Sequence, residues 1–196
     1  QPNAKAGDIR FKDVTGDGVI DEDDKEYCGT GIPKFETNLN FSASYKGFDL
    51  SFSLSGVFGH KIYNGNRYFY ESMNAPINML STVANAWTPE NTHTDIPRAV
   101  NGDPNGNSRE SERFLENGSF VRLRQAQIGY TLPVSLLKKV KIEKLRFYIS
   151  GDNLFTITGY SGVDPEFSTS SPLNSGVDRY IYPFTRSYTV GAQLTF

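Results

Sequence analysis

Alternation of apolar and polar residues marks several stretches of this chain as β-strands. In two neighbouring stretches, large apolar residues such as Phe41 and Phe52 alternate with Ser, Asn and Asp, and Lys46-Gly47 between them has the length of a hairpin turn. A period of two places successive side chains on opposite faces of a sheet, so each stretch predicts one apolar and one polar face. The predicted strands are residues 38–45, 48–55, 119–132, 145–157 and 187–196.

The third predicted strand changes step along its length. Its second half is apolar at even positions, as at Ile128 and Tyr130, whereas Val121 and Leu123 in its first half are apolar at odd positions. In that first half, the charged residue Arg122 stands at an even position. A change of parity predicts either a β-bulge or a segment that stands above the region in which one face is apolar.

The connections between the predicted strands alternate in length. Residues 46–47 and 133–143 are short links, whereas 59–117 and 158–184 are long loops rich in Asn, Gly, Pro and Tyr. Outer-membrane barrels have short periplasmic turns and longer extracellular loops, and this assignment runs the last strand toward the periplasm. We therefore predict an all-β fold in which antiparallel strands, about five here, belong to a larger transmembrane β-barrel, because the smallest such barrels have about eight.

Composition and charge narrow the classes of partner. The chain is 13% aromatic with 18 Gly and 10 Pro, which favours strands and turns over helices. A formal charge of −2 offers no basic surface, so we expect no nucleic-acid partner. The chain begins at Gln1 without an apolar leader, and we expect any signal peptide to lie upstream or to have been removed.

Residues 13–24 space their oxygen-bearing side chains as a calcium-binding loop does. Gly18 stands at loop position 6, where the chain must turn sharply. The loop departs from the EF-hand pattern because position 12 is Asp24, shorter than Glu, and because residues 9–11 before it look extended. We expect a Ca²⁺ site, with Mg²⁺ as the second choice and a solvated turn as the alternative. The predicted ligands are Asp13, Thr15, Asp17, Asp21, Asp24 and the main-chain carbonyl of Val19.

Other candidate residues carry weaker signals. His60 and His93 lack neighbours at triad or zinc spacing, so we expect both on surface loops. The acidic pairs 110/112 and 164/166 have the residue type for acid–base catalysis but no other support, and the chain is predicted not to be an enzyme. Loop aromatics could stack on a ligand, although an interfacial belt or loop packing is the alternative. These weak substrate-binding candidates are Tyr63, Tyr68, Tyr70, Tyr180 and Tyr182.

Several motifs, in order along nearly the whole chain, resemble the C-terminal region of SusC/RagA outer-membrane proteins. They are GDIRFKD at 7–13, YKGFDLS at 45–51, WTPEN at 87–91, GSFVRLR at 118–124, GYTLP at 129–133, NLFT at 153–156, YSGVDPE at 160–166 and the terminal Phe196.

This resemblance implies a barrel of about 22 strands with an N-terminal plug. It also implies import energised by the TonB complex, with a SusD-like surface lipoprotein as partner and oligosaccharides, or in some members peptides, as substrate. The location implied is the outer membrane of a Gram-negative, Bacteroidetes-like cell. On this view residues 1–33 are an extracellular segment carrying the acidic turn, residues 34–196 supply the closing strands, and the plug and the TonB contact lie upstream.

A different class of protein also fits the strand pattern. A calcium-stabilised β-sandwich that binds glycans or proteins would show the same alternation, but it must bury its apolar face in a core of its own. A barrel leaves that face in lipid. The two predictions therefore differ in what covers the apolar face.

Overall fold

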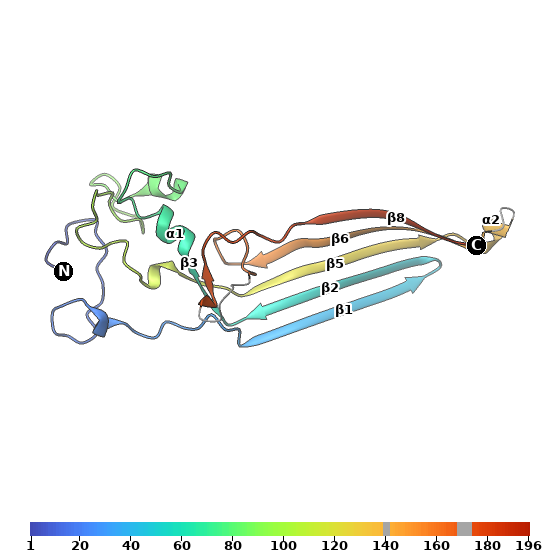
Figure 1. The fold of residues 1–196 in the computed structure, drawn as a ribbon, viewed down its shortest axis with the longest axis horizontal. Helices are drawn as coiled ribbons and strands as arrows, with labels where there is room; N and C mark the ends of the chain where they lie inside the picture. The colour runs from blue at the N-terminus through green and yellow to red at the C-terminus, as the bar shows by residue number, and fades with distance from the viewer. Residues whose placement is uncertain (139–141, 168–173) are drawn as a thin grey trace.

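The long strands form a single antiparallel sheet in the computed structural model, which describes residues 1–138, 142–167 and 174–196. Each strand pairs with the next long strand along the chain, so the sheet is a meander (Figure 1). All five predicted strands are confirmed, with β1 beginning three residues earlier and β2 ending three residues later than predicted. In spatial order they are β1 (Phe35–Tyr45), β2 (Phe48–Phe58), β5 (Phe120–Thr131), β6 (Lys144–Thr158) and β8 (Ser187–Thr195).

The two ends of the sheet differ as the lengths of the connections predicted. Lys46 and Gly47 join β1 to β2 with φ values of 46° and 87°, which is the pattern of a type I′ turn, a turn whose twist matches that of a hairpin. The link from β5 to β6, which contains the short helix α2 (Val134–Leu137), lies at this end with the C-terminus (Figure 1). The long segments gather at the opposite end.

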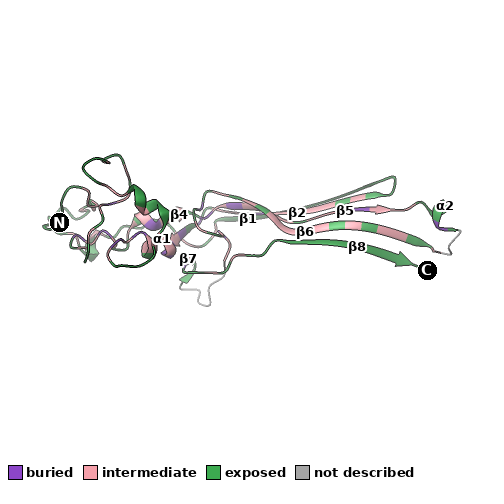
Figure 2. Ribbon diagram, turned by 90° about the horizontal axis from the view of Figure 1, so that it is seen from above, coloured by how far each residue is buried: buried purple, intermediate pink, exposed green. Residues whose placement is uncertain are grey.

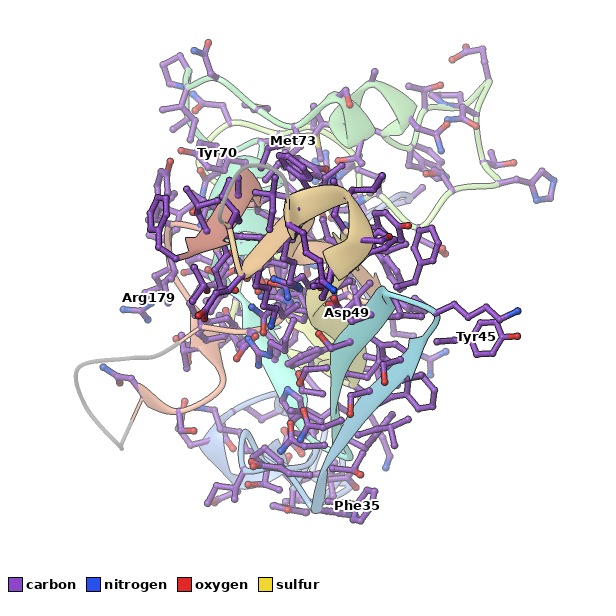
Figure 3. The ribbon with its side chains drawn as sticks, turned by 90° about the vertical axis from the view of Figure 1, so that its right-hand side faces the viewer. Phe35, Tyr45, Asp49, Tyr70, Met73 and Arg179 are labelled. Atoms are coloured by element: carbon purple, nitrogen blue, oxygen red, sulfur yellow. The ribbon has the colours of Figure 1, made fainter. Side chains whose placement is uncertain are left out.

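Pairing between strands sorts the side chains into rows of one polarity. One row that crosses the whole sheet consists of Ala43, Leu50, Ile128, Ile149 and Val190. The neighbouring row consists of Ser42, Ser51, Gln127, Ser150 and Thr189. In the end-on view, Tyr45 of the apolar face points away from the molecule and Asp49 lies on the other side of the sheet (Figure 3). The sheet thus has one apolar face and one polar face.

The apolar face is open along its whole length. Every residue of β1 is exposed, and Ile149 and Val190 are 56% and 80% exposed (Figure 2). Within the described residues no second sheet packs on this face, because the other sheet is a small one at the loop end. The β-sandwich alternative is therefore wrong: the apolar face has no protein core to cover it, and lipid is the medium that suits it.

The predicted β-bulge is confirmed and lies at Arg124. Leu123 and Gln125 face consecutive residues of β2, Leu54 and Ser53, so Arg124 is the extra residue. The same interruption appears in the pairing of β5 with β6, where Asn153 has a φ of 51°. One extra residue explains why the apolar parity of the strand changes between its two halves.

The long segments fold into a unit of their own, here called the loop module, made of residues 59–117, 158–167 and 174–184. A parallel pair and an antiparallel pair of short strands form its sheet, in the order β4-β3-β7. Most of the buried apolar residues lie here, including Ile62 and Phe114. Its elements are β3 (Lys61–Asn64), α1 (Gly65–Tyr70), η2 (Ser81–Asn85), η3 (Glu112–Phe114), β4 (Leu115–Asn117) and β7 (Val177–Asp178).

The N-terminal segment lies against the loop module. Asp8 forms an ion pair with Arg98, with Nε–Oδ1 and Nη2–Oδ2 distances of 2.7 and 3.0 Å. Gly7 lies under the ring of Trp87, so closely that a Cβ would come within 2.4 Å of it. Two of the motifs found in the sequence, at 7–13 and 87–91, are therefore in contact. No helix among the described residues is long and apolar enough to cross a membrane.

The orientation of the two faces can be tested with adjacent residues of β6. Replacing Ile149 by Lys in the intact protein places a charge on the lipid side, which costs about 2–4 kcal/mol near the middle of a bilayer. Ser150→Lys places the same charge on the polar face. We expect the first variant to lose folded barrel in the outer-membrane fraction, measured by heat-dependent mobility in detergent gels, and the second to keep it. Equal loss in both variants would contradict the assignment.

Candidate functional site

The polar face carries its highest density of charge where the strands meet the loop module. Arg122 and Arg124 project from the bulged part of β5. Nε of Arg122 donates to Oγ1 of Thr156 at 2.8 Å, and Nε of Arg124 donates to Oγ of Ser55 at 2.7 Å. Neutral hydroxyls on the two neighbouring strands therefore fix both guanidinium groups.

Two carboxylates from the last long loop meet these arginines. Glu166 lies 3.0 Å from Nη1 of Arg122 and 2.5 Å from Nη2 of Arg124, and Asp164 accepts a hydrogen bond from Arg122. Arg122 is only 2% exposed. We call these four residues the arginine clamp. Because a buried arginine is costly unless paired, the clamp holds this loop inward against the polar face.

Further contacts extend the clamp toward β8. The main-chain N–H of Phe184 donates to Oδ2 of Asp164 at 3.1 Å, and the guanidinium of Arg122 lies 5.4 Å from the centre of the Phe184 ring. The last long loop, residues 158–184, is therefore attached to β5 both near its beginning, at Asp164, and at its end, at Phe184. Asp164 and Glu166, which the sequence presents only as a weak candidate pair for acid–base catalysis, are both engaged in ion pairs in the structure. The sign of these ion pairs in the sequence is the charge of Arg122 and Arg124, which stand at alternate positions of the third predicted strand.

A second ion pair lies on the polar face at the opposite end of the sheet. Arg146 donates to both oxygens of Asp49, at 2.9 and 2.5 Å. Its guanidinium lies over Gly129, where a Cβ would come within 2.5 Å of Nη2. Glycine at this position is therefore needed for the close approach of the arginine. In the same row, the ring of Tyr148 covers Gly191 in the same way.

The acidic loop brings together only part of the predicted ligand set. The hydroxyl of Thr15 is 3.3 Å from Asp13 Oδ1 and 3.4 Å from Asp24 Oδ1, so loop positions 1, 3 and 12 converge. Asp17 and Asp21 accept instead from nearby main-chain N–H groups, at Val19 and Asp23. Among the described residues no three acidic, histidine or cysteine side chains gather as a cation would require.

The oxygen atoms of this loop are nevertheless those that a hard cation prefers. Asp24 is held by main-chain N–H groups of Val14, Thr15 and Asp21, and these hydrogen bonds, the one from Asp21 first, lower its pKa. Asp13 accepts from the N–H groups of Gly16 and Gly18. The carboxylates of Asp13 and Asp24 are thus held in place by hydrogen bonds, which fits a calcium donor set, and the site stays a prediction.

The five candidate tyrosines fall into different environments. Tyr63 and Tyr68 pack around Phe114 inside the loop module, and burial raises the pKa of Tyr63 to about 12. Tyr70 meets Tyr180 edge to face, with ring centres 5.8 Å apart. Tyr182 is 83% exposed. Tyr180 and Tyr182 therefore keep exposed ring surface, whereas Tyr63, Tyr68 and Tyr70 are half-buried.

A buried polar network stiffens the loop module. Glu116 accepts from the main chain and hydroxyl of Ser161 at 2.7 Å each, from Asn64 at 3.0 Å and from Arg67 at 3.2 Å. Burial raises the pKa of Glu116, but these hydrogen bonds outweigh burial and the net shift is downward. Glu116 is therefore ionised at neutral pH and ties the last long loop to β3 and α1.

The prediction for the two histidines is half wrong. His93 is exposed, but His60 is only 7% exposed and its Nδ1 has no hydrogen-bond partner among the described residues. Its imidazole packs so closely on Gly118 that a Cβ there would lie 2.4 Å from Nε2. The absence of a side chain at Gly118, far away in the sequence, makes room for the burial of His60.

Comparison with known proteins finds relatives over nearly the whole chain, although no family model matches it. It is 34% identical over 192 residues to TonB-dependent receptor P3 of Formosa agariphila, covering 95% of this chain and 19% of that protein. It is 27% identical over 196 residues to TonB-dependent receptor SusC of Bacteroides thetaiotaomicron, covering 99% and 18%. The chain thus spans about a fifth of the length of these relatives.

Solved structures give the same result. The RagAB peptide transporter matches with a TM-score of 0.76 and 30% identity, covering 91% of this chain and 19% of that one. The RagAB peptide importer in its open-open state matches with a TM-score of 0.70 and 32% identity, covering 84% and 17%. The sheet and its loops therefore match a segment of a β-barrel of this kind.

The clamp predicts how tightly the last long loop is held. Glu166→Gln in the intact protein removes the charge that faces both arginines, and we expect cleavage after Arg179 by trypsin on whole cells to become about tenfold faster, because cleavage follows the population of the released loop. Asp152→Asn, a similar change on the polar face outside the clamp, should leave the rate unchanged. Equal rates for the wild type and Glu166→Gln would show that the clamp does not restrain the loop.

Proposed function

Because the chain belongs to the SusC/RagA-type TonB-dependent receptors, we propose that the intact protein is an active importer in the outer membrane of a Bacteroidetes-like cell. Its substrates are oligosaccharides or peptides. One observation carries the proposal: rows of single polarity run unbroken across the sheet, with an exposed apolar face for lipid. The similarity to SusC and to RagAB supports import as the task of such a barrel.

The chain has a structural part in this task. Its polar face lines the lumen, where serine, threonine and glutamine side chains such as Ser51 and Gln127 offer hydrogen bonds to a passing solute. Its loop module lies outside the cell, since the short turns mark the periplasmic end. The plug and the contact with the TonB complex come from the remainder of the intact protein, and the chain carries out no covalent chemistry.

A SusD-like surface lipoprotein is the proposed partner at the extracellular end. RagAB, which resembles the chain, is described as a peptide transporter. The exposed rings of Tyr180 and Tyr182 lie on the loop module, where Tyr180 contacts the half-buried Tyr70, and aromatic side chains are enriched where proteins meet. We therefore assign these three to the surface that meets the lipoprotein or the substrate.

We also propose that the acidic loop binds Ca²⁺, in preference to Mg²⁺. Support comes from the convergence of Asp13, Thr15 and Asp24 and from the flexible oxygen set that calcium accepts. Asp17, Asp21 and the carbonyl of Val19 would complete the coordination. A bound ion would supply only rigidity, holding the segment before β1 in one conformation.

Uptake by cells tests the import proposal. Cells that express the intact receptor and its lipoprotein should accumulate labelled oligosaccharides or peptides, and a protonophore should abolish this accumulation because TonB coupling needs the proton gradient. Cells without the receptor provide the control. Accumulation that is the same in both strains, or that survives the protonophore, would exclude TonB-dependent import by this protein.

Calorimetry tests the calcium proposal. Asp13→Ala combined with Asp17→Ala in the intact protein should abolish the heat of Ca²⁺ binding, because two of the oxygen ligands are lost. Glu22→Ala combined with Asp23→Ala removes the same charge from the same loop but no predicted ligand, and should retain binding. If the first pair of substitutions leaves the titration unchanged, the assignment of the site is wrong.

A further inference from the structure

The hairpin turn that joins β1 to β2 carries a lysine at a position that favours other residue types. Lys46 has a φ of 46°, in the left-handed region that is strained for most residues other than Gly, Asn and Asp. Type I′ turns favour those three residues at their central positions for this reason. Residues held in a strained backbone conformation concentrate at functional sites. The side chain of Lys46 is therefore worth examining for a partner.

A row of aromatic side chains crosses the apolar face beside this turn. It consists of Tyr45, Phe48, Tyr130 and Phe147, which pair from strand to strand. The rings of Phe48 and Tyr130 lie 4.5 Å apart. Aromatic residues on the outer surface of a membrane barrel gather at the level of the lipid headgroups. The hairpin turn next to this row therefore lies at the edge of the bilayer.

The ammonium group of Lys46 lies beside this row. Its Nζ is 5.1 Å from the centre of the Tyr45 ring. Tyr45 belongs to the apolar face and points away from the molecule (Figure 3). A cation over an aromatic ring is attracted by the π electrons of the ring, which favours this direction of the flexible lysine side chain. The charge is thereby placed on the lipid side of the sheet.

No acidic side chain offsets the charge of Lys46 within the described residues. Lys46 takes part in none of their ion pairs. The nearest carboxylate along the chain, that of Asp49, is bound by Arg146 on the polar face. A cation at the edge of a bilayer attracts anionic lipid headgroups. The phosphate of an anionic phospholipid would supply the missing negative charge.

The surface below Lys46 suits the remainder of a lipid molecule. Tyr45 and Phe48 are 71% and 55% exposed on the apolar face. Ala43 and Leu50 form the next apolar row toward the middle of the sheet. Acyl chains gain free energy by covering such a surface, whereas a free phosphate ion does not. A phospholipid therefore satisfies both the charge of Lys46 and the exposed rings.

We propose that Lys46 and the aromatic row bind an anionic phospholipid of the inner leaflet, with the phosphate at the Lys46 ammonium and the acyl chains along Tyr45 and Phe48. The inference rests on the membrane placement in the proposed function and goes beyond import. The site fixes the depth at which the periplasmic end of the β1–β2 hairpin lies in the bilayer.

Photo-cross-linking in the intact receptor tests the site. Benzoylphenylalanine in place of Leu50 leaves every residue of the site intact, because Leu50 lies in the next apolar row. The receptor is placed in nanodiscs with equal amounts of phosphatidylglycerol, which is anionic, and phosphatidylethanolamine, which is zwitterionic. Mass spectrometry should show about fivefold more captured phosphatidylglycerol, the preference that one lysine near a membrane surface gives. Inorganic phosphate should not lower this ratio.

Lys46→Asn in this receptor separates lipid binding from folding. Asparagine suits the turn better than lysine does, so the variant should fold at least as well as the wild type by gel mobility, while the lipid ratio falls to that of the bilayer. Lys46→Arg should keep the preference because it keeps the charge. Lys5→Asn removes an exposed lysine near the N-terminus, at the opposite end of the molecule (Figure 1), and should leave the ratio unchanged.

The other outcomes each contradict the proposal. If the ratio in the wild type equals that of the bilayer, or if Lys46→Asn leaves it unchanged, Lys46 does not hold an anionic headgroup. Cross-linked receptor dimers would show that a second copy of the chain covers the row. Capture of no lipid at all would mean that the apolar face lies outside the bilayer, which also removes the membrane placement. Failure of import itself appears only in the uptake assay.

Discussion

Complete pairing of main-chain hydrogen bonds is the constraint on which the rest of this structure depends. In lipid an unpaired N–H or C=O costs several kcal/mol, so neighbouring strands must stay in register over their full length. The type I′ turn at Lys46-Gly47 sets that register for the first pair, and each later strand inherits it. Once the register is set, the two-residue period of the strands places apolar side chains on one face of the sheet and polar side chains on the other. Ala43 and Val190, at opposite edges of the sheet, then belong to one apolar row although no single contact joins them.

The single departure from this regularity in β5 has a structural consequence. In a regular strand Arg122 and Arg124 would lie on one face and Leu123 on the other. The apolar residues would then keep the same parity along the whole strand. The extra residue at Arg124 lets Leu123 remain opposite Leu54 in the apolar rows while Gln125 pairs with Ser53 in the polar rows. Both arginines lie on the polar face, where Ser55 and the acidic residues of the loop satisfy them. The bulge thus changes the parity without placing a guanidinium group in lipid.

The strands could be predicted from the sequence, because alternation, turn residues and connection length are local signals. The loop module could not, since its strands are short, from two to four residues, and show no alternation. The clamp joins residues 42 positions apart, and nothing near Arg122 in the sequence indicates Asp164. The burial of His60 depends on Gly118 in the same way. The predicted calcium ligands show the opposite case: their spacing in the sequence fits a calcium loop, yet only Asp13, Thr15 and Asp24 converge in the structure.

The clamp also explains why charge is placed at the junction of sheet and loops. The last long loop has no apolar core beneath it, because the face of the sheet on which it lies is polar. Hydrophobic packing is therefore weak there, and ion pairs that are shielded from water take its place. Arg122 meets this condition, being almost completely buried between Thr156, Asp164 and the ring of Phe184. The loop is thereby held against the polar face through Asp164 and Glu166, without an apolar core beneath it.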